Sequence, residues 1–290
     1  MLQRHKSLRI LVIAALAGPA IAISPNSPTP RPTARELSAR VWTCPTHEQL
    51  RLFARGTCPI DGVDLVRRKV TIDGPDVPGD PYTLANCPVT GLVLGDTGPP
   101  IVMMHEGREV RFGTTECIGR FQADPARYLA KIDARIIEQQ MAGYPLTTCP
   151  VSLEPLGSMG DPVDYVYNNR LVRFCCKGCL RGFKKNPGPV LAVLDKAVIA
   201  EQLADYLLKS CPISGEDLGS MGGPIDYVIA NQLVRLCCTG CVSAFYKNPA
   251  PHLASLREAR GKSDTSRKHE DSGHGNDHLD HGHHDHDHGH

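Results

Sequence analysis

A repeat of 62 residues constrains the fold of this 290-residue chain more than any other feature of its sequence. Two sets of cysteines recur at that spacing, the first set with Pro after each member: Cys87, Cys149 and Cys211, and Cys117, Cys179 and Cys241. Residues 171–176 return almost unchanged as residues 233–238. A period of this kind indicates several copies of one supersecondary unit. We therefore predict three small modules in tandem.

The same order of elements is expected in each module. In the second one, β-type runs at 163–167 and 171–174 flank Asn168-Asn169, a pair that favours a hairpin turn. A helix carrying Phe183 follows residues 175–179. Pro187 then starts a second helix through about residue 208. Apolar residues near helical spacing predict that this second helix packs one module on the next: Leu191, Leu194, Val198, Leu203 and Leu207.

The composition narrows the class of protein. With 32 Lys and Arg against 31 Asp and Glu, the net charge of +1 argues against a nucleic-acid binder that neutralises phosphates. One Trp, eight Tyr and six Phe are few for a single large core. The 12 Cys therefore suggest that disulfides or metal ions hold the small modules together.

Both ends of the chain differ from the modules. Residues 1–22 resemble a secretory signal peptide, with a basic start, an apolar run at 10–17 and the cleavage site Ala20-Ile21-Ala22. A membrane anchor is the alternative, but the run is short and Gly18-Pro19 interrupts it. Residues 23–38 form a Pro-rich linker, and residues 261–290 a His-rich tail that we expect to be disordered. These features predict a secreted or periplasmic protein without a stable membrane anchor.

The cysteines of the second and third modules are candidate metal ligands. They are Cys149, Cys175, Cys176 and Cys179 in one module, and Cys211, Cys237, Cys238 and Cys241 in the other. A Cys-x-x-Cys at a strand-to-helix turn lets two thiolates converge on one ion, and thiolate-rich sites suit Zn(II) or Cu(I). Neighbouring residues on a strand point to opposite faces. We therefore expect one Cys of each vicinal pair to ligate, and the sequence does not choose between them.

The first module departs from this pattern. Gly113 and Thr114 stand where the other modules have the vicinal cysteines, while Cys87 and Cys117 are kept. We favour a degenerate module, with a Cys87–Cys117 disulfide as one form of it. The alternative is a mixed copper site that includes Met103, Met104, His105 and Glu116.

A separate knuckle precedes the modules. Cys44-Pro-Thr-His47 and Cys58-Pro-Ile-Asp61 repeat the same kind of turn, and Cys, His and carboxylate are all zinc ligands. A Cys44–Cys58 disulfide is the alternative, although it does not explain the paired turns.

Two resemblances to known families follow from these motifs. Residues 42–66 resemble the heavy-metal-binding domain found beside copper-exporting ATPases and efflux adaptors, with Thr46, Asp61 and Val63 in place of Met, Cys and Met. These replacements remove one thiolate and two thioethers, the soft ligands that select Cu(I). The modules resemble YHS or TRASH-like domains, with an early Cys-Pro, a hairpin, a Cys-Cys-x-x-Cys and a following Phe.

These resemblances imply an α+β fold of small zinc-ribbon-like modules, each a β-hairpin plus helix, that bind or sense metals. The implied domains are residues 39–70, 84–145, 146–207 and 208–260. The tail adds imidazoles that suit Zn(II), Ni(II), Co(II) or Cu(II). Metal binding by these imidazoles would be lost near pH 6, because His gains a proton there. They are His281, His283, His284, His286, His288 and His290.

We expect an exported protein that buffers, sequesters or delivers Zn- or Cu-type metals, with a metal efflux system or metallochaperone as its partner. A disulfide-built structural or adaptor protein is the first alternative. A thiol redox protein using Cys176/Cys179 and Cys238/Cys241 is the second. We do not expect an enzyme, because the sequence has no evident Ser-His-Asp arrangement or phosphate-binding loop.

Overall fold

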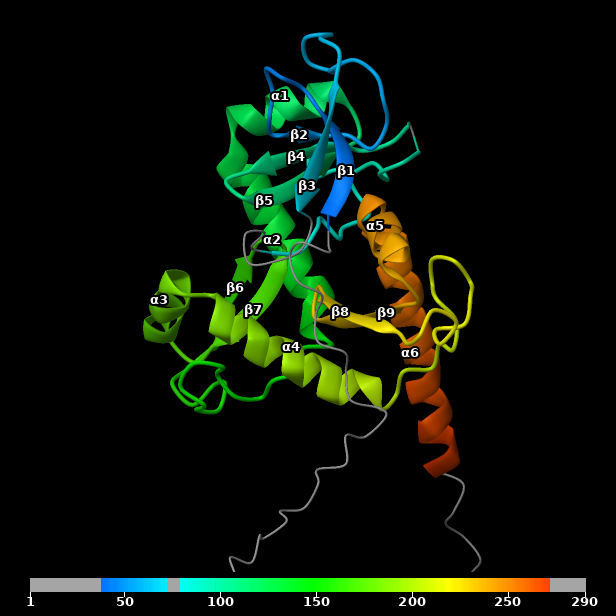
Figure 1. The fold of residues 1–290 in the computed structure, drawn as a ribbon. Helices are drawn as coiled ribbons and strands as arrows, with labels where there is room; N and C mark the ends of the chain where they lie inside the picture. The colour runs from blue at the N-terminus through cyan, green and yellow to red at the C-terminus, as the bar shows by residue number, and fades with distance from the viewer. Residues whose placement is uncertain (1–37, 72–78, 97, 272–290) are drawn as a thin grey trace, which may run out of the picture.

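The computed structural model describes residues 38–71, 79–96 and 98–271, which form a mixed α+β fold of small antiparallel sheets and helices (Figure 1). The N-terminal segment contributes β1 (Ser38–Thr43), β2 (Leu50–Arg51) and β3 (Val66–Thr71). Among the described residues, no helix has the length and apolar character needed to cross a membrane. The signal peptide, residues 23–37 of the linker and residues 272–290 of the tail lie outside the described residues.

Each of the three modules is a hairpin followed by a short helix and a longer one. The first has β4 (Ile101–His105), β5 (Arg108–Phe112), α1 (Thr115–Ala123) and α2 (Pro125–Met141). The second has β6 (Val163–Tyr167), β7 (Arg170–Phe174), α3 (Lys177–Lys185) and α4 (Gly188–Leu203). The third has β8 (Ile225–Ile229), β9 (Gln232–Leu236), α5 (Thr239–Lys247) and α6 (Pro249–Asp271).

The hairpins confirm the predicted turns. Asn168 and Asn169 have φ of 42° and 70°, and the equivalent Ala230 and Asn231 have 53° and 56°. Two consecutive residues with positive φ match the right-handed twist of the flanking strands. Asn tolerates this backbone better than most residues. The turn therefore sets the register in which Tyr167 opposes Arg170.

The short helix of each module supplies the centre of that module's core. Phe121, Phe183 and Phe245 occupy equivalent positions and are each almost completely buried. Burying a side chain of this size contributes about 1.5–3 kcal/mol to folding. In the second and third modules these helices begin directly after the vicinal cysteines and carry the last cysteine in their first turn, so the core also fixes where those thiols lie.

The longer helices join neighbouring modules, as predicted. Helix α2 packs on β6 and β7, and α4 packs on β8 and β9. The predicted end of α4 at about residue 208 is wrong, because the helix ends at Leu203. Beyond it, the Tyr206 hydroxyl accepts a hydrogen bond from the Arg235 backbone N–H at 3.2 Å. That bond and the packing of Leu208 against the core of the third module draw the chain out of the helix.

The buried face of α4 also differs in part from the prediction. Leu194 and Val198 are buried as expected, but Leu207 is exposed. Gln202 is buried instead, and its amide bonds the backbone of Asn231 and Leu233. Both polar ends of Gln202 are therefore satisfied where it enters the core.

Buried polar side chains form a ladder between the modules. Arg108 Nε donates to Asn169 Oδ1, and Arg170 Nε donates to Asn231 Oδ1, each at 2.8 Å. Each arginine also pairs at 2.6 Å with a carboxylate of the long helix that follows it, Asp133 or Asp195. The equivalent residue of the third module is Gln232. At this position of the repeat, Arg is therefore present in the two modules that are followed by another module and absent from the last one.

The N-terminal segment is not the separate knuckle that the sequence indicates. Strand β2 joins β4 and β5 in a three-stranded sheet, and Cys44 and Leu50 pack in the core of the first module. Val41, on the adjoining strand, packs in the core of the third module. Figure 1 shows the consequence, with α5 lying near the lower end of β1.

A buried arginine completes this closure. The Arg111 guanidinium donates to the carbonyls of Tyr246 and Lys247, each at 2.7 Å, at the end of α5. Carbonyls at a helix C-terminus lack partners within the helix, and a cation there is favourable. The first and third modules are thereby held together, although they are 124 residues apart at equivalent positions such as Cys117 and Cys241.

The beginning of the predicted tail is helical. Helix α6 continues to Asp271, so residues 261–271 belong to it and not to a disordered segment. The chain from 254 to 260 is rich in Ala, Leu, Arg and Glu, which favour helix, and no Pro follows before the helix ends.

Candidate metal centres

Three clusters of side chains within the described residues could hold a metal ion. Each brings its possible ligand atoms within 4.8 Å of one another. They are Cys44, His47, Cys58 and Asp61; Cys149, Cys175 and Cys179; and Cys211, Cys237 and Cys241. We call them the knuckle, the second-module triad and the third-module triad.

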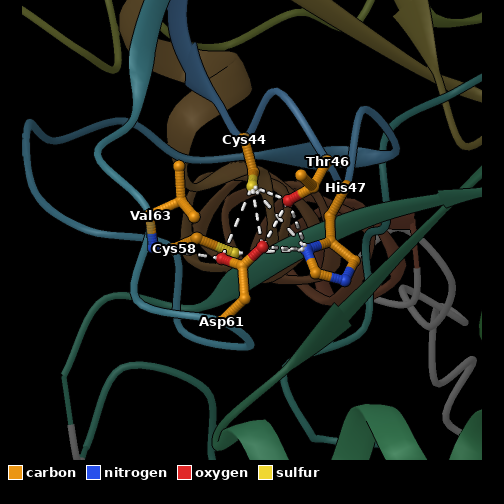
Figure 2. A network of polar contacts seen from close by, with 6 residues as sticks. All are labelled: Cys44, Thr46, His47, Cys58, Asp61 and Val63. Carbon is orange, nitrogen blue, oxygen red and sulfur yellow. Dashed lines mark hydrogen bonds and ion pairs between the residues drawn. The ribbon is translucent and has the colours of Figure 1, made fainter.

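The knuckle is built from two turns that face each other (Figure 2). Cys44 follows β1, and the turn after it is closed by a bond from the Leu50 N–H to the His47 carbonyl at 2.9 Å. Gly62, with φ of 74°, closes the other turn on the Cys58 carbonyl, also at 2.9 Å. In Figure 2 the side chains of both turns converge on one point.

The spacing of these atoms matches a tetrahedral ion. Cys44 Sγ lies 3.6 Å from His47 Nδ1 and 3.7 Å from each carboxylate oxygen of Asp61. His47 Nδ1 lies 3.5 Å from Cys58 Sγ and 3.2 Å from Asp61 Oδ2. Zn–S bonds of about 2.3 Å with Zn–N and Zn–O bonds of about 2.0–2.2 Å place tetrahedral ligand atoms about 3.3–3.8 Å apart. The residues present therefore fit zinc.

Hydrogen bonds in the knuckle favour the ionised ligands. Burial opposes ionisation of Cys44, but hydrogen bonds from Thr46 and His47 outweigh it and lower the pKa of this thiol to about 7. Thr46 also bonds Asp61 and, with Cys58, holds the pKa of that carboxyl well below its usual range. Burial raises the pKa of Cys58. Metal ions bind thiolate and carboxylate, so two of the four ligands are prepared for binding.

The two triads have the same construction. The first cysteine of each lies in a turn, where the Leu153 N–H bonds the Cys149 carbonyl and the Gly215 N–H bonds the Cys211 carbonyl, both at 2.9 Å. The second cysteine follows the last strand of the hairpin, and the third lies in the first turn of the short helix. Turn, strand and helix thus each supply one sulfur.

The sulfurs of the triads lie close together, and every triad cysteine except the half-buried Cys179 is buried. Cys175 and Cys179 are 3.7 Å apart, and Cys237 and Cys241 are 3.6 Å apart. Two thiolates on one tetrahedral zinc ion are about 3.8 Å apart. A serine accompanies each triad, with Ser152 Oγ 3.2 Å from Cys175 Sγ and Ser214 Oγ 3.3 Å from Cys237 Sγ.

The structure separates the two members of each vicinal pair. Cys175 and Cys237 belong to the triads, whereas Cys176 and Cys238 lie outside them and are half-buried. Cys176 Sγ is nevertheless only 3.8 Å from Cys179 Sγ, and Cys238 Sγ is 3.7 Å from Cys241 Sγ. Each is the N-cap residue of its helix.

The thiols within a triad differ in acidity. Burial disfavours ionisation of Cys149 and Cys211, yet hydrogen bonds from backbone N–H groups lower the pKa of each to about 6. Burial, together with hydrogen bonding to a neighbouring cysteine, raises the pKa of Cys179 and Cys241 to about 12. One thiol of each triad is therefore favoured as the thiolate near neutral pH.

The described residues of the first module bring together no such cluster of Cys, His, Asp and Glu. Cys87 and Cys117 are buried, and all twelve cysteines are unpaired in the structure. Met103 is buried in the core, and the His105 ring packs edge-on against Phe121 at 5.2 Å. Met103 shares that core with Cys87 and Cys117, and the mixed copper site considered from the sequence stays a prediction.

Sequence reasoning missed three hydroxyl groups at these sites, those of Thr46, Ser152 and Ser214. The signal for the serines was present, because each stands three residues after the first cysteine of its triad. Thr46 stands inside the first turn of the knuckle. The six tail histidines lie outside the described residues.

Comparison with known proteins gives no relative. No protein-family model matches the chain, and neither a curated protein nor a solved structure is significantly similar to it.

Proposed function

We propose that this is an exported, non-enzymatic metal-binding protein that buffers, sequesters or delivers zinc or copper ions. The proposal rests chiefly on one observation, the gathering of Cys, His and Asp ligand atoms into three compact clusters. The chemistry of these ligands, with eight thiols, one imidazole and one carboxylate, suits Zn(II) or Cu(I).

The spacing within the clusters supports zinc in the knuckle and either ion in the triads. The knuckle offers four ligands near tetrahedral distances, which is the arrangement of closed zinc sites. Each triad offers three thiols, a set that Cu(I) accepts and that zinc would complete with a fourth ligand.

The proposal also includes export from the cytoplasm and a partner that exchanges metal with this protein. The basic and apolar start of the chain supports passage out of the cytoplasm, into the periplasm or medium. The His-rich end would add weaker, exchangeable sites for Zn(II), Ni(II), Co(II) or Cu(II). A metal efflux system or a metallochaperone is the partner that such a carrier would serve.

Titration with Co(II) under anaerobic, reducing conditions tests the proposal. Thiolate ligands give Co(II) a charge-transfer absorption that imidazole ligands do not, so the three clusters can be read in the presence of the tail. We expect three thiolate-bound equivalents per chain, one for each cluster.

Matched variants assign the signal. Cys58→Ser should remove the knuckle equivalent, whereas Cys87→Ser, a buried thiol outside the clusters, should remove none. No thiolate absorption in the reduced wild-type chain would contradict the proposal and favour a disulfide-built structural protein.

A further inference from the structure

We infer that Cys176 and Cys238 are capture ligands: they take a thiophilic metal ion from an external donor and pass it to the buried triad beside them. This inference rests on the proposed function, because it concerns how metal reaches the triads.

The burial of the triads favours such a ligand, although Cys179 of the second-module triad is itself half-buried. Cys149 and Cys175 are 0% and 2% exposed, and Cys211 and Cys237 are 2% and 4% exposed. An ion that is still bound to a donor cannot contact these sulfurs without first losing its other ligands. Cys176 and Cys238, the half-buried members of the vicinal pairs, can be reached from solvent.

The position of the outer thiols suits exchange more than permanent coordination. Cys176 lies 3.8 Å from Cys179 Sγ, within the reach of one shared ion, but falls outside the group whose ligand atoms are all mutually close. A fixed fourth zinc ligand would be about 3.8 Å from all three triad sulfurs. The same arrangement in the third module, at 3.7 Å, shows that it belongs to the construction of the module.

The transfer is a sequence of ligand exchanges without oxidation or reduction. The Cys176 thiolate forms a bond to the metal as one donor ligand leaves. Cys179 then binds the ion and loses its proton to solvent. Bonds to Cys149 and Cys175 follow as the remaining donor ligands depart, the Cys175 thiol also losing its proton to solvent, and the bond to Cys176 breaks last. A change between staggered χ1 rotamers moves a cysteine sulfur by about 3 Å, which suffices for each step.

The charge around Cys176 indicates the class of donor. Helix α3 presents four exposed cations, Lys177, Arg181, Lys184 and Lys185. The equivalent residues of α5 are Thr239, Ser243, Tyr246 and Lys247, so only one cation is kept. Clustered positive charge speeds encounter with anions. The second module is therefore suited to metal that arrives in an anionic complex, such as a carboxylate or thiolate chelate.

Stopped-flow loading of the full reduced chain with Co(II), supplied in an anionic aminocarboxylate complex, tests the inference. Cys176→Ser should slow the appearance of thiolate-to-cobalt absorption in the second module by roughly tenfold, equivalent to about 1.4 kcal/mol in the barrier. The final absorption should equal that of wild type. Cys238→Ser should do the same for the third module, and Cys87→Ser should change neither rate nor amplitude.

The other outcomes separate the capture role from alternatives. An unchanged loading rate in Cys176→Ser would overturn the inference. Loss of a full equivalent in that variant would overturn it too, because Cys176 would then be a permanent ligand. Cys175→Ser is the contrasting variant and should lose that equivalent. An absence of thiolate absorption in wild type would refute the proposed function itself.

Discussion

Thr46 shows how one residue can adapt a metal-binding turn. Its hydroxyl lies 3.0 Å from Cys44 Sγ and 3.3 Å from His47 Nδ1, and it also bonds Asp61. The resembling domain has a Met here, which would offer a thioether. In this chain the hydroxyl instead holds the ligands themselves and favours their ionised forms. A hard carboxylate with a supporting hydroxyl suits zinc better than Cu(I).

Thr46→Val should raise the pKa of Cys44 from about 7 toward its ordinary value of 9.0, because the hydrogen bond that stabilises the thiolate is lost. The thiolate fraction of Cys44 at pH 7 should fall from about one half toward about one in a hundred. Ultraviolet absorption of thiolates, measured during a pH titration of the metal-free chain, reports this change.

Thr43→Val is the matched control for that titration. The Thr43 hydroxyl is buried and has no hydrogen-bond partner among the described residues. Its loss should leave the titration unchanged. If Thr46→Val and Thr43→Val titrate alike, Thr46 does not set the acidity of Cys44.

The sequence indicated which residue types could bind metal, but not which cysteine of each vicinal pair belongs to the triad. Whether Cys175 or Cys176 faces Cys149 depends on where β7 ends and α3 begins, since the strand ends at Phe174 and Cys176 already caps the helix. Sequence patterns locate such a boundary only within a few residues. An error of one residue in this boundary would exchange the predicted positions of Cys175 and Cys176.

At the scale of elements, the junctions between modules depend on buried polar contacts as much as on apolar packing. Asn169 is fully buried, and its side chain accepts from Arg108 while donating to the carbonyls of Asp80 and Glu109. The amide of Gln140 on α2 bonds both the Asn169 carbonyl and the Leu171 N–H. The turn of one hairpin is thus clamped by the preceding module, which fixes the orientation of the triad beyond it.

Arg170→Ala should destabilise the metal-free chain by about 3 kcal/mol, because it leaves Asp195 without its buried cation and Asn231 without a donor. Urea unfolding under reducing conditions measures the loss. Arg135→Ala removes an exposed ion pair with Glu138 and should cost less than about 1 kcal/mol. Equal losses in the two variants would contradict the importance of the ladder.

The elements themselves were the most predictable part of the fold. Asn168-Asn169 between two β-type runs located a hairpin, and the apolar spacing after Pro187 located a helix that joins two modules. The end of that helix was misplaced because Tyr206 bonds a strand formed about 30 residues later and Leu208 packs against the core of the third module. Propensity describes only neighbours in sequence and does not register such a contact.

For the whole molecule, the chain folds back on itself and does not extend as a line of modules. The Arg111 bonds to the end of α5 and the bond from the Ala230 N–H to Asp80 Oδ2, at 2.6 Å, link the first and last parts of the fold. These are single contacts between residues about 135–150 positions apart, without a periodic pattern that would predict them.

This closure makes the two triads unequal. The core of the third module includes Val41 of β1, and Cys241 is buried, whereas Cys179 on the peripheral α3 is half-buried. Burial raises the pKa of both thiols to about 12, so ionisation does not distinguish them. The two thiols differ instead in their access to solvent.

Alkylation of the metal-free chain should therefore modify Cys179 several times faster than Cys241. Peptide mass spectrometry over a time course with iodoacetamide gives both rates in one experiment. Cys176 and Cys238, both half-buried, should react at similar rates and serve as the internal control. Equal rates for Cys179 and Cys241 would show that the closed arrangement does not protect the third module.

The central claim, that three thiol-rich clusters bind metal, is tested most directly by X-ray absorption of the full chain loaded with three equivalents of Zn(II). The eight cluster sulfurs shared by three ions predict between two and three sulfurs per zinc, at about 2.3 Å. A first shell of nitrogen and oxygen alone, at about 2.0–2.2 Å, would contradict the claim, because the ions would then lie outside the cysteine clusters.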